Sequence, residues 1–136
     1  MARIDVFVHL VWSTWRRLQV IAEASEGQRH AAMAARCVSE RCPPPAVGGV
    51  ADHVHLLVRL DPSVPIARLV DAVKGTSSYL MNHEISPGRR FRWQERYGAV
   101  SLAPDDVPAV ERYVREQRSH HRVSQLLDEL EPTDAT

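Results

Sequence analysis

The stretch from residue 52 to residue 60 constrains the fold of this chain more than any other. It reads Asp-His-Val-His-Leu-Leu-Val-Arg-Leu, an apolar run of strand length that carries two histidines. In a β-strand, residues i and i+2 project from the same face, so His53 and His55 would lie side by side on a sheet. Two imidazoles on a rigid strand provide half of a divalent-metal site. A pair of strand histidines in a polar patch has the same spacing, so both interpretations stay open.

Length and composition indicate a single globular domain. The chain has 136 residues, of which 44% are hydrophobic and 25% charged, values typical of a domain with a sizeable core. No apolar run approaches the roughly 20 residues of a membrane span, and we expect no membrane contact. The N-terminal residues alternate like a strand and do not resemble a signal peptide, and Cys37 and Cys42 form no Cys-x-x-Cys pair. We therefore expect a cytoplasmic protein with reduced thiols.

The formal net charge is zero, but the charges are unevenly placed. Residues 123–136 carry four acids and no Lys or Arg, so residues 1–122 hold 17 basic against 13 acidic side chains, a net charge of +4. Sixteen of the 17 basic residues are Arg, and eight of these lie between residues 89 and 122. Arg binds phosphate with two donors and stacks on bases, so a polyanionic partner is possible, although a coding bias towards Arg would also enrich it. We expect a domain over residues 1–122 and an acidic, partly helical or frayed tail over 123–136.

The order of apolar patterns predicts an α+β, ferredoxin-like sandwich. We expect strands at 3–12, 46–50, 53–60 and about 97–102, and helices near 25–41, 64–83 and 105–121. This β-α-β-β-α-β order with one additional C-terminal helix is typical of a four-stranded sheet with two helices on one face. The first and third strands are central in such a sheet, which places His53 and His55 in its middle. The extra helix can then cover the opposite face.

The expected last helix carries a phenol and a carboxamide one turn apart. Val107, Val110 and Val114 form its apolar stripe, and Tyr113 and Gln117 lie along one edge of that stripe. A helix docked through these valines would hold both side chains near the sheet. A Tyr/Gln pair at this spacing also occurs as a simple surface hydrogen-bonding pair, so the pattern alone does not assign a role.

Several short motifs follow one another along most of residues 3–122. They are residues 9–14 (HLVWST) with 16–17 (RR), 52–58 (DHVHLLV), 74–75 (KG) with 77–78 (SS), 91–94 (FRWQ), 97–101 (YGAVS) and 113–117 (YVREQ) with 120–121 (HH). In this order they resemble the small single-tyrosine HUH transposases of single-strand insertion sequences and the related REP-associated tyrosine transposases. No single motif is decisive, but their ordered combination is specific.

The resemblance implies a ferredoxin-like fold, a homodimer, and a bacterial protein of the nucleoid that cuts and rejoins single-stranded DNA next to an imperfect hairpin. It implies that His53, His55 and Gln117 hold Mg²⁺ or Mn²⁺. It also implies that Tyr113 is the nucleophile, which forms a 5′-phosphotyrosine link and leaves a free 3′-OH. By coordination preference the two histidines favour Zn²⁺ or Mn²⁺ over Mg²⁺, so Mn²⁺ is expected on both grounds and Mg²⁺ on the resemblance.

Basic and aromatic residues outside this centre are candidates for DNA contact. They are Arg16, Arg17, Lys74, Arg89, Arg90, Arg92, Trp93, Arg96, Tyr97, His120 and His121. Aromatic rings stack on bases while guanidinium groups hold phosphates, which is typical of single-strand binding surfaces. Ordinary packing would account for Trp93 equally well, and a solvated helix end would account for the two adjacent histidines.

Two further phenols and a third strand histidine carry similar chemistry but are expected to have other roles. For Tyr97 we expect a structural or base-stacking role, and for Tyr79 a packed position. His9 could face the metal side of the sheet, but a satisfied strand histidine is the expected role.

Two other functions are compatible with the same residues. One is a domesticated or inactive relative that binds hairpin DNA or RNA without cutting it. The other is a metal-dependent phosphodiesterase in which water attacks and Tyr113 plays no part in the reaction.

Overall fold

The computed structural model describes residues 4–85 and 90–116 of the chain. The strands are β1 (Phe7–Ser13), β2 (Ala46–Val50), β3 (His53–Arg59) and β4 (Gly98–Leu102), and the helices are α1 (Glu26–Ser39), α2 (Ile66–Leu80) and α3 (Val107–Arg115). Short 3-10 turns cover Trp15–Arg17, Glu23–Ser25 and Pro104–Asp106, and a π-helical turn, Met81–Ile85, continues α2.

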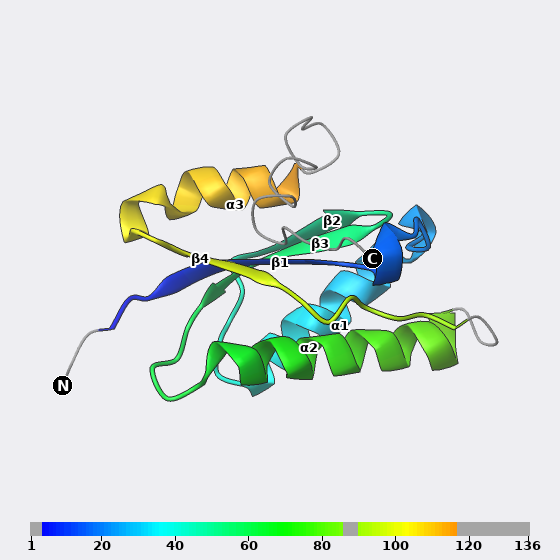
Figure 1. The fold of residues 1–136 in the computed structure, drawn as a ribbon. Coiled ribbons are helices and arrows are strands. Elements are labelled where there is room, and N and C mark those ends of the chain that lie inside the picture. Colours follow the sequence, from blue (N-terminus) through cyan, green and yellow to red (C-terminus); the bar gives the residue numbers. More distant parts are fainter. Residues whose placement is uncertain (1–3, 86–89, 117–136) are drawn as a thin grey trace.

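The strands form one antiparallel sheet in the order β2-β3-β1-β4. The central positions of β1 and β3 are those predicted from the sequence. Helices α1 and α2 lie together on one face of the sheet, and α3 crosses the other face (Figure 1). The predicted ferredoxin-like α+β sandwich with an additional helix is therefore confirmed.

The main core lies between the sheet and the α1/α2 layer. Its strand residues are Val8, Leu10 and Trp12 of β1 and Val54, Leu56 and Val58 of β3, all of them buried. Helix α1 adds Met33 and Cys37, and α2 adds Leu69, Val70 and Val73. Burying a side chain of this size stabilises the fold by about 1.5–3 kcal/mol. The even-numbered residues of β1 and β3 therefore supply much of the stability.

The opposite face has a smaller apolar cluster that docks α3. Val114 is fully buried against Ala46 and Leu57, as the predicted apolar stripe of the helix requires. Gly48 lies directly beneath the helix, where an added Cβ would collide with the Val114 carbonyl oxygen. The Arg115 guanidinium donates to the Pro45 carbonyl at 2.6 Å and ties the end of α3 to the start of β2. Helix α3 thus packs closely on the sheet of its own chain.

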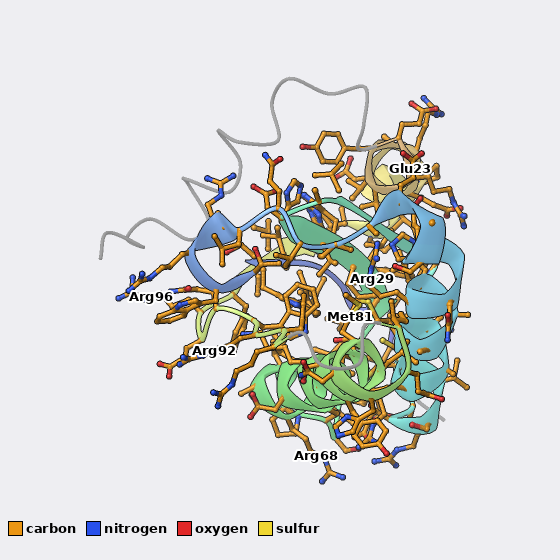
Figure 2. The ribbon with its side chains drawn as sticks, turned by 90° about the vertical axis from the view of Figure 1, so that its right-hand side faces the viewer. Glu23, Arg29, Arg68, Met81, Arg92 and Arg96 are labelled. Carbon is orange, nitrogen blue, oxygen red and sulfur yellow. The ribbon has the colours of Figure 1, made fainter. Side chains whose placement is uncertain are left out.

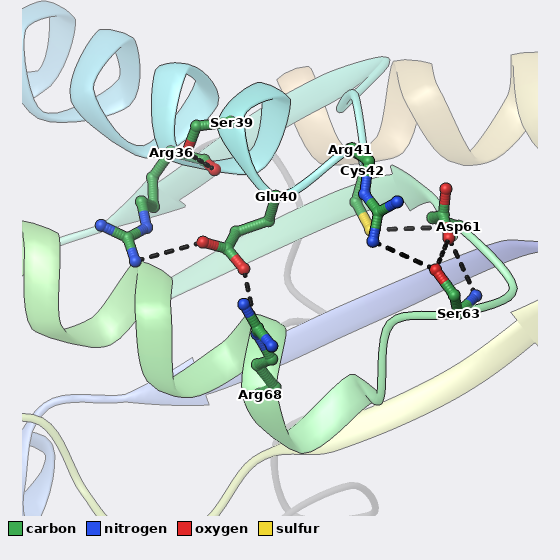
Figure 3. A network of polar contacts seen from close by, with 8 residues as sticks. All are labelled: Arg36, Ser39, Glu40, Arg41, Cys42, Asp61, Ser63 and Arg68. Carbon is green, nitrogen blue, oxygen red and sulfur yellow. Dashed lines mark hydrogen bonds and ion pairs between the residues drawn. The ribbon is translucent and has the colours of Figure 1, made fainter.

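Polar contacts at the surface join the ends of α1 and α2 (Figure 3). Glu40 accepts from Arg36 at 3.1 Å and from Arg68 at 3.4 Å. Nearby, Arg41 donates to the Ser63 hydroxyl, which in turn donates to the Asp61 carboxylate. The arginine side chains of these ion pairs are exposed and Glu40 is half-buried, so each pair contributes about 1 kcal/mol or less to the stability of the fold.

Most of the observed elements differ from the predicted ones by a few residues at their ends, and β2 has the predicted bounds. Strand β1 starts at Phe7 instead of residue 3, because Phe7 lies opposite Arg59 and Leu102, the last residues of β3 and β4. The alternation in the sequence continues before Phe7, but Ile4 and Val6 are exposed there, and the Val6 carbonyl accepts a backbone hydrogen bond from the Leu60 N–H at 2.7 Å just beyond β3. Helix α3 begins at Val107 after a 3-10 turn and ends at Arg115, because its C-cap Glu116 has non-helical φ and ψ angles. The predicted 105–121 helix is therefore too long at this point, and its residues 117–121 lie outside the described residues.

Candidate functional site

His53 and His55 lie in the central strand β3 on the face covered by α3. Their neighbours Val54 and Leu56 belong to the main core on the other face, and Leu57 packs on α3. Both histidines are buried, with exposed fractions of 2% and 0%, and their ring centroids are 5.1 Å apart. The structure therefore has the side-by-side arrangement that the His-x-His spacing predicts.

Each of the two imidazoles is held through its Nδ1 atom. His53 Nδ1 lies 2.6 Å from Asp52 Oδ1, and His55 Nδ1 lies 2.7 Å from His9 Nε2. The Nε2 atoms of His53 and His55 are buried and have no hydrogen-bond partner among the described residues. Buried polar atoms are nearly always paired, so these two nitrogens on neighbouring rings are candidates for binding a ligand. Imidazole Nε2 atoms suit a divalent cation such as Mn²⁺, so this pair fits a metal.

The pair alone does not complete a metal site. Within residues 4–85 and 90–116, no three His, Cys, Asp or Glu side chains are arranged to hold a metal ion. A further ligand would have to be of another type or come from elsewhere. Gln117, the predicted third ligand, lies outside the described residues, as do the candidates Arg89, His120 and His121.

Helix α3 places the phenol of Tyr113 beside the same histidines. The ring centroid of Tyr113 is 5.9 Å from that of His55 and 6.3 Å from that of His9, both in edge-on geometry. Tyr113 is half-buried and packs next to the Val114 cluster that docks the helix. The structure thus brings together in one chain the predicted nucleophile and one predicted metal ligand, which are 58 positions apart in the sequence.

The titratable groups at this site have pKa values set by burial and by close partners. Burial lowers the pKa of His9 to about 4, and burial together with the neighbouring His9 and His53 lowers the pKa of His55 well below 6.5. Both rings are therefore neutral near pH 7, with a nitrogen lone pair each. Burial would raise the pKa of Asp52, but its hydrogen bond with His53 and the nearby charges of His53 and Arg17 keep this pKa below its ordinary value. Asp52 is accordingly a carboxylate.

A cationic and aromatic surface lies on the turn after β1. The Arg92 guanidinium stacks on Trp15 with its carbon 4.0 Å from the ring centroid, and that of Arg16 lies at 5.5 Å. Arg92 and Arg96 are exposed and point away from the body of the molecule on the side remote from α1 (Figure 2). Stacked guanidinium and indole groups are suited to phosphates and bases.

This turn is also joined to the histidine site. Arg16 and Arg17 have positive φ angles of 55° and 54°, which residues other than glycine and asparagine rarely adopt. Arg17 forms an ion pair with the second oxygen of Asp52 at 3.6 Å, and the first oxygen holds His53. The predicted DNA-contact residue Arg17 is therefore connected to a predicted metal ligand through one carboxylate.

Two other predicted DNA contacts are placed differently. The Lys74 amine donates to the carbonyls of Gln94, Glu95 and Arg96 at 2.7, 3.1 and 3.1 Å, so it holds the loop before β4. Trp93 is 6% exposed and donates its indole N–H to Ser77 at 2.9 Å. The structure therefore gives both residues a supporting position, and for Trp93 it is the ordinary packing that the sequence also allowed.

The remaining candidates divide between the surface and the core. Arg90 is exposed at the start of the 90–97 loop, while Tyr97 is half-buried against the main core beneath Lys74. Tyr79 is 60% exposed and stacks on His83, so the prediction that it is packed is wrong. Its neighbours Ser77 and Leu80 take the buried positions of α2 instead, which leaves Tyr79 on the outer side of the helix.

Sequence reasoning missed the partners that orient the histidines. Nothing in the sequence pattern assigns Asp52 to the His53 ring or pairs Trp15 with Arg92. The alternation of His9 with Val8 and Leu10 places it on the α3 face, but only the register between β1 and β3 brings it next to His55.

Comparison with known proteins places this chain in a transposase family. The chain matches the family described as IS200-like transposases over residues 3–117, and it belongs to that family. No helix in the described part of the chain is long and apolar enough to cross a membrane.

Solved structures support the same fold. A Deinococcus radiodurans R1 protein assigned as a transposase is 22% identical, with a TM-score of 0.67 over 88% of this chain and 94% of that one. A REP-associated tyrosine transposase bound to a REP hairpin is 11% identical, with a TM-score of 0.59 over 84% of this chain and 68% of that one. No curated protein sequence matches the chain significantly.

Proposed function

We propose that this IS200-like transposase cleaves and rejoins single-stranded DNA next to a hairpin, with Tyr113 as the nucleophile and a divalent cation held by His53, His55 and Gln117. The observation that carries the proposal is the Tyr113 ring beside His55, next to two buried Nε2 atoms that have no partner among the described residues. Membership of a transposase family supports DNA strand transfer as the reaction class. The hairpin bound to a structural relative supports the kind of substrate.

The proposed chemistry follows from the groups at the site. A phenol has a pKa near 10 and is a weak nucleophile at neutral pH, so its attack needs a polarised phosphate and a route for its proton. Mg²⁺ or Mn²⁺ bound at this site would supply charge stabilisation to the phosphate oxygens. The docked helix α3 holds the Tyr113 ring on the same face of the sheet as the two imidazoles, which lowers the entropic cost of attack.

The strand-transfer step exchanges one phosphodiester for another. The Tyr113 phenol loses its proton as its oxygen forms a bond to phosphorus. The bond from phosphorus to the 3′ oxygen breaks, and that oxygen takes up a proton to become a free 3′-OH, so no net proton is gained or lost. The 5′-phosphate remains on the tyrosine as a diester, so its bond energy is retained. Attack by a 3′-OH then reverses the step without ATP.

The surface of Trp15, Arg16, Arg92 and Arg96 would hold the single strand. Arg side chains neutralise phosphates and stack on bases, and Trp15 offers a ring to the same segment. Lys74 would act indirectly, because its amine binds the loop that carries Arg92 and Arg96. The proposal includes a homodimer, which size-exclusion chromatography with light scattering would detect.

The test uses labelled single-stranded oligonucleotides that contain imperfect hairpins from DNA flanking the gene, incubated with the full chain and Mn²⁺. We expect a covalent protein–DNA adduct that is absent in Tyr113→Phe and unchanged in Tyr79→Phe. Tyr79 is a matched control because it is an exposed phenol on α2, across the sheet from the site.

Two other outcomes would replace this proposal. Hairpin binding without cleavage in the wild-type protein would indicate a domesticated or inactive binding protein. Cleavage that persists in Tyr113→Phe without an adduct would indicate a phosphodiesterase in which water attacks.

A further inference from the structure

The hydrogen bonds of His53 and His55 determine which ring nitrogen of each carries a proton. In each ring the Nδ1 atom faces a protein group and the Nε2 atom has no partner among the described residues. A histidine binds a cation through a nitrogen that carries no proton, and the hydrogen bond at the other nitrogen decides which one that is. The groups that face Nδ1 therefore decide whether Nε2 is available.

His53 and His55 have different partners at Nδ1. His53 faces the Asp52 carboxylate, which can only accept, so His53 Nδ1 must carry the proton. His55 faces the Nε2 atom of His9, which can accept or donate. The state of His55 thus depends on a second histidine that the proposed mechanism does not otherwise use.

His9 reaches His55 across the central strand pair. His9 is opposite Leu57 in the register, and His55 is opposite Val11, so the two histidines are diagonal neighbours on the same face of the sheet. Their rings stack with centroids 4.9 Å apart at an interplanar angle of 30°, and both are buried. The hydrogen bond of 2.7 Å is therefore enclosed and short.

When both rings are neutral, the proton of the His9–His55 hydrogen bond can belong to either residue. If His9 donates from Nε2, His55 carries its own proton on Nε2, where a cation would have to bind. If His55 donates from Nδ1, His9 accepts and His55 Nε2 keeps a free lone pair. Only the second form allows His55 to act as a ligand.

We propose that His9 is a positioning residue that accepts the Nδ1–H of His55 and so keeps His55 Nε2 free of a proton for a divalent cation. The cation part of this inference rests on the proposed function, but the hydrogen-bond part concerns the metal-free chain. Hydrogen-bond partners of metal-binding histidines typically change metal affinity by about 10- to 100-fold.

The first test measures Mn²⁺ affinity of the full chain without DNA, by electron paramagnetic resonance of free Mn²⁺. In His9→Phe the ring volume and the stack on His55 remain but no acceptor is present, and we expect affinity to fall by about 10- to 100-fold. In His9→Gln the side-chain carbonyl can accept from His55 Nδ1, and we expect affinity within about threefold of wild type. Thermal unfolding of both variants without metal checks that the fold is kept.

The second test locates the proton directly by ¹⁵N NMR of the histidine rings in the metal-free wild-type chain. We expect His55 to carry its proton on Nδ1, and a proton on Nε2 would overturn the inference. Equal Mn²⁺ affinity in all three proteins, or an equal loss in both variants, would also overturn it. A wild-type chain that binds no Mn²⁺ would refute the metal in the proposed function, whereas the NMR result would still decide the orientation of the His9–His55 bond.

Discussion

The two faces of the sheet use the same strands for different purposes. On the α1/α2 face, β1 and β3 contribute Val8, Leu10, Trp12, Val54, Leu56 and Val58 to a continuous apolar core. On the α3 face, the alternate residues of the same strands include His9, His53 and His55. One strand pair therefore holds the fold together with one side and presents polar groups with the other.

This difference shows how the histidine site can be held rigidly although its own residues do not stabilise the fold. On the α3 face, burial of His53 and His55 costs free energy, because their Nε2 atoms have no partner within the described part of the chain. The packed core on the other face offsets this cost and holds the backbone of β1 and β3 in place. Three predictions test that division, from the largest expected change in stability to the smallest.

Substitutions of the adjacent residues Leu56 and His55, which lie on opposite faces, should have opposite effects on stability and on Mn²⁺ binding. Leu56→Ala removes a fully buried core side chain, so we expect the free energy of unfolding to fall by about 2–5 kcal/mol while the folded protein keeps its Mn²⁺ affinity. His55→Asn places an amide N–H where Nδ1 donates to His9 but removes Nε2, so Mn²⁺ binding should be lost with a stability change below about 1 kcal/mol. Urea unfolding and Mn²⁺ titration of both variants would measure this. Equal stability losses would contradict the division.

Acid should destabilise the α3 face first. The folded-state pKa of His9 is about 4, below the ordinary value of 6.5, so the unfolded chain binds more protons between these values. Stability should therefore be complete above about pH 6.5 and fall as pH decreases towards 4, by about 3 kcal/mol from His9 alone. The lowered pKa of His55 acts in the same direction. The lowered pKa of Asp52 adds stability that is lost only below about 3.8.

Urea unfolding in metal-free buffer at about pH 7.5 and about pH 4.5 would test this dependence. His9→Gln removes one of the two rings that have a lowered pKa and should make stability depend less steeply on pH. If the free energy of unfolding of the wild type is the same at both pH values, burial of these rings does not govern the acid response. The same conclusion follows if this free energy changes with pH equally in the wild type and in His9→Gln.

The close packing of α3 on β2 should depend on Gly48, which has no side chain. In Gly48→Ala the new methyl group would meet the Val114 carbonyl, so α3 must move away from the sheet, with a cost of about 1–3 kcal/mol. Because α3 carries Tyr113, formation of the DNA adduct should also slow. Gly75→Ala is the matched control, since its Cβ has no atom within 4 Å and alanine favours the α2 helix.

Hydrogen exchange of the α3 amides would report the displacement in Gly48→Ala directly. Faster exchange in α3 with unchanged exchange in α2 is expected. If α3 stays protected and the adduct forms at the wild-type rate, the position of Tyr113 does not depend on this contact.

The sequence predicted the parts of the fold that depend on local periodicity. The alternation in β3 correctly assigned His53 and His55 to one face and Val54 to the other, and the valine stripe correctly assigned the docking face of α3. The limits of β1 were less accurate, because they depend on where the partner strands end. The exposed position of Tyr79 differs from the prediction, because Tyr79 lies on the outer side of α2, away from the buried positions of Ser77 and Leu80.

The sequence by itself determined which residues share a face, because side-chain direction in a strand or helix follows from the backbone repeat alone. Tertiary structure decided which of them meet. His9 reaches His55 only through the β1–β3 register, and Lys74 caps the 94–96 carbonyls only because α2 lies under that loop. Tyr113 lies beside His55 because Gly48 admits the helix. These contacts depend on strand register and on the space left between elements, which are properties of the whole fold and not of any segment.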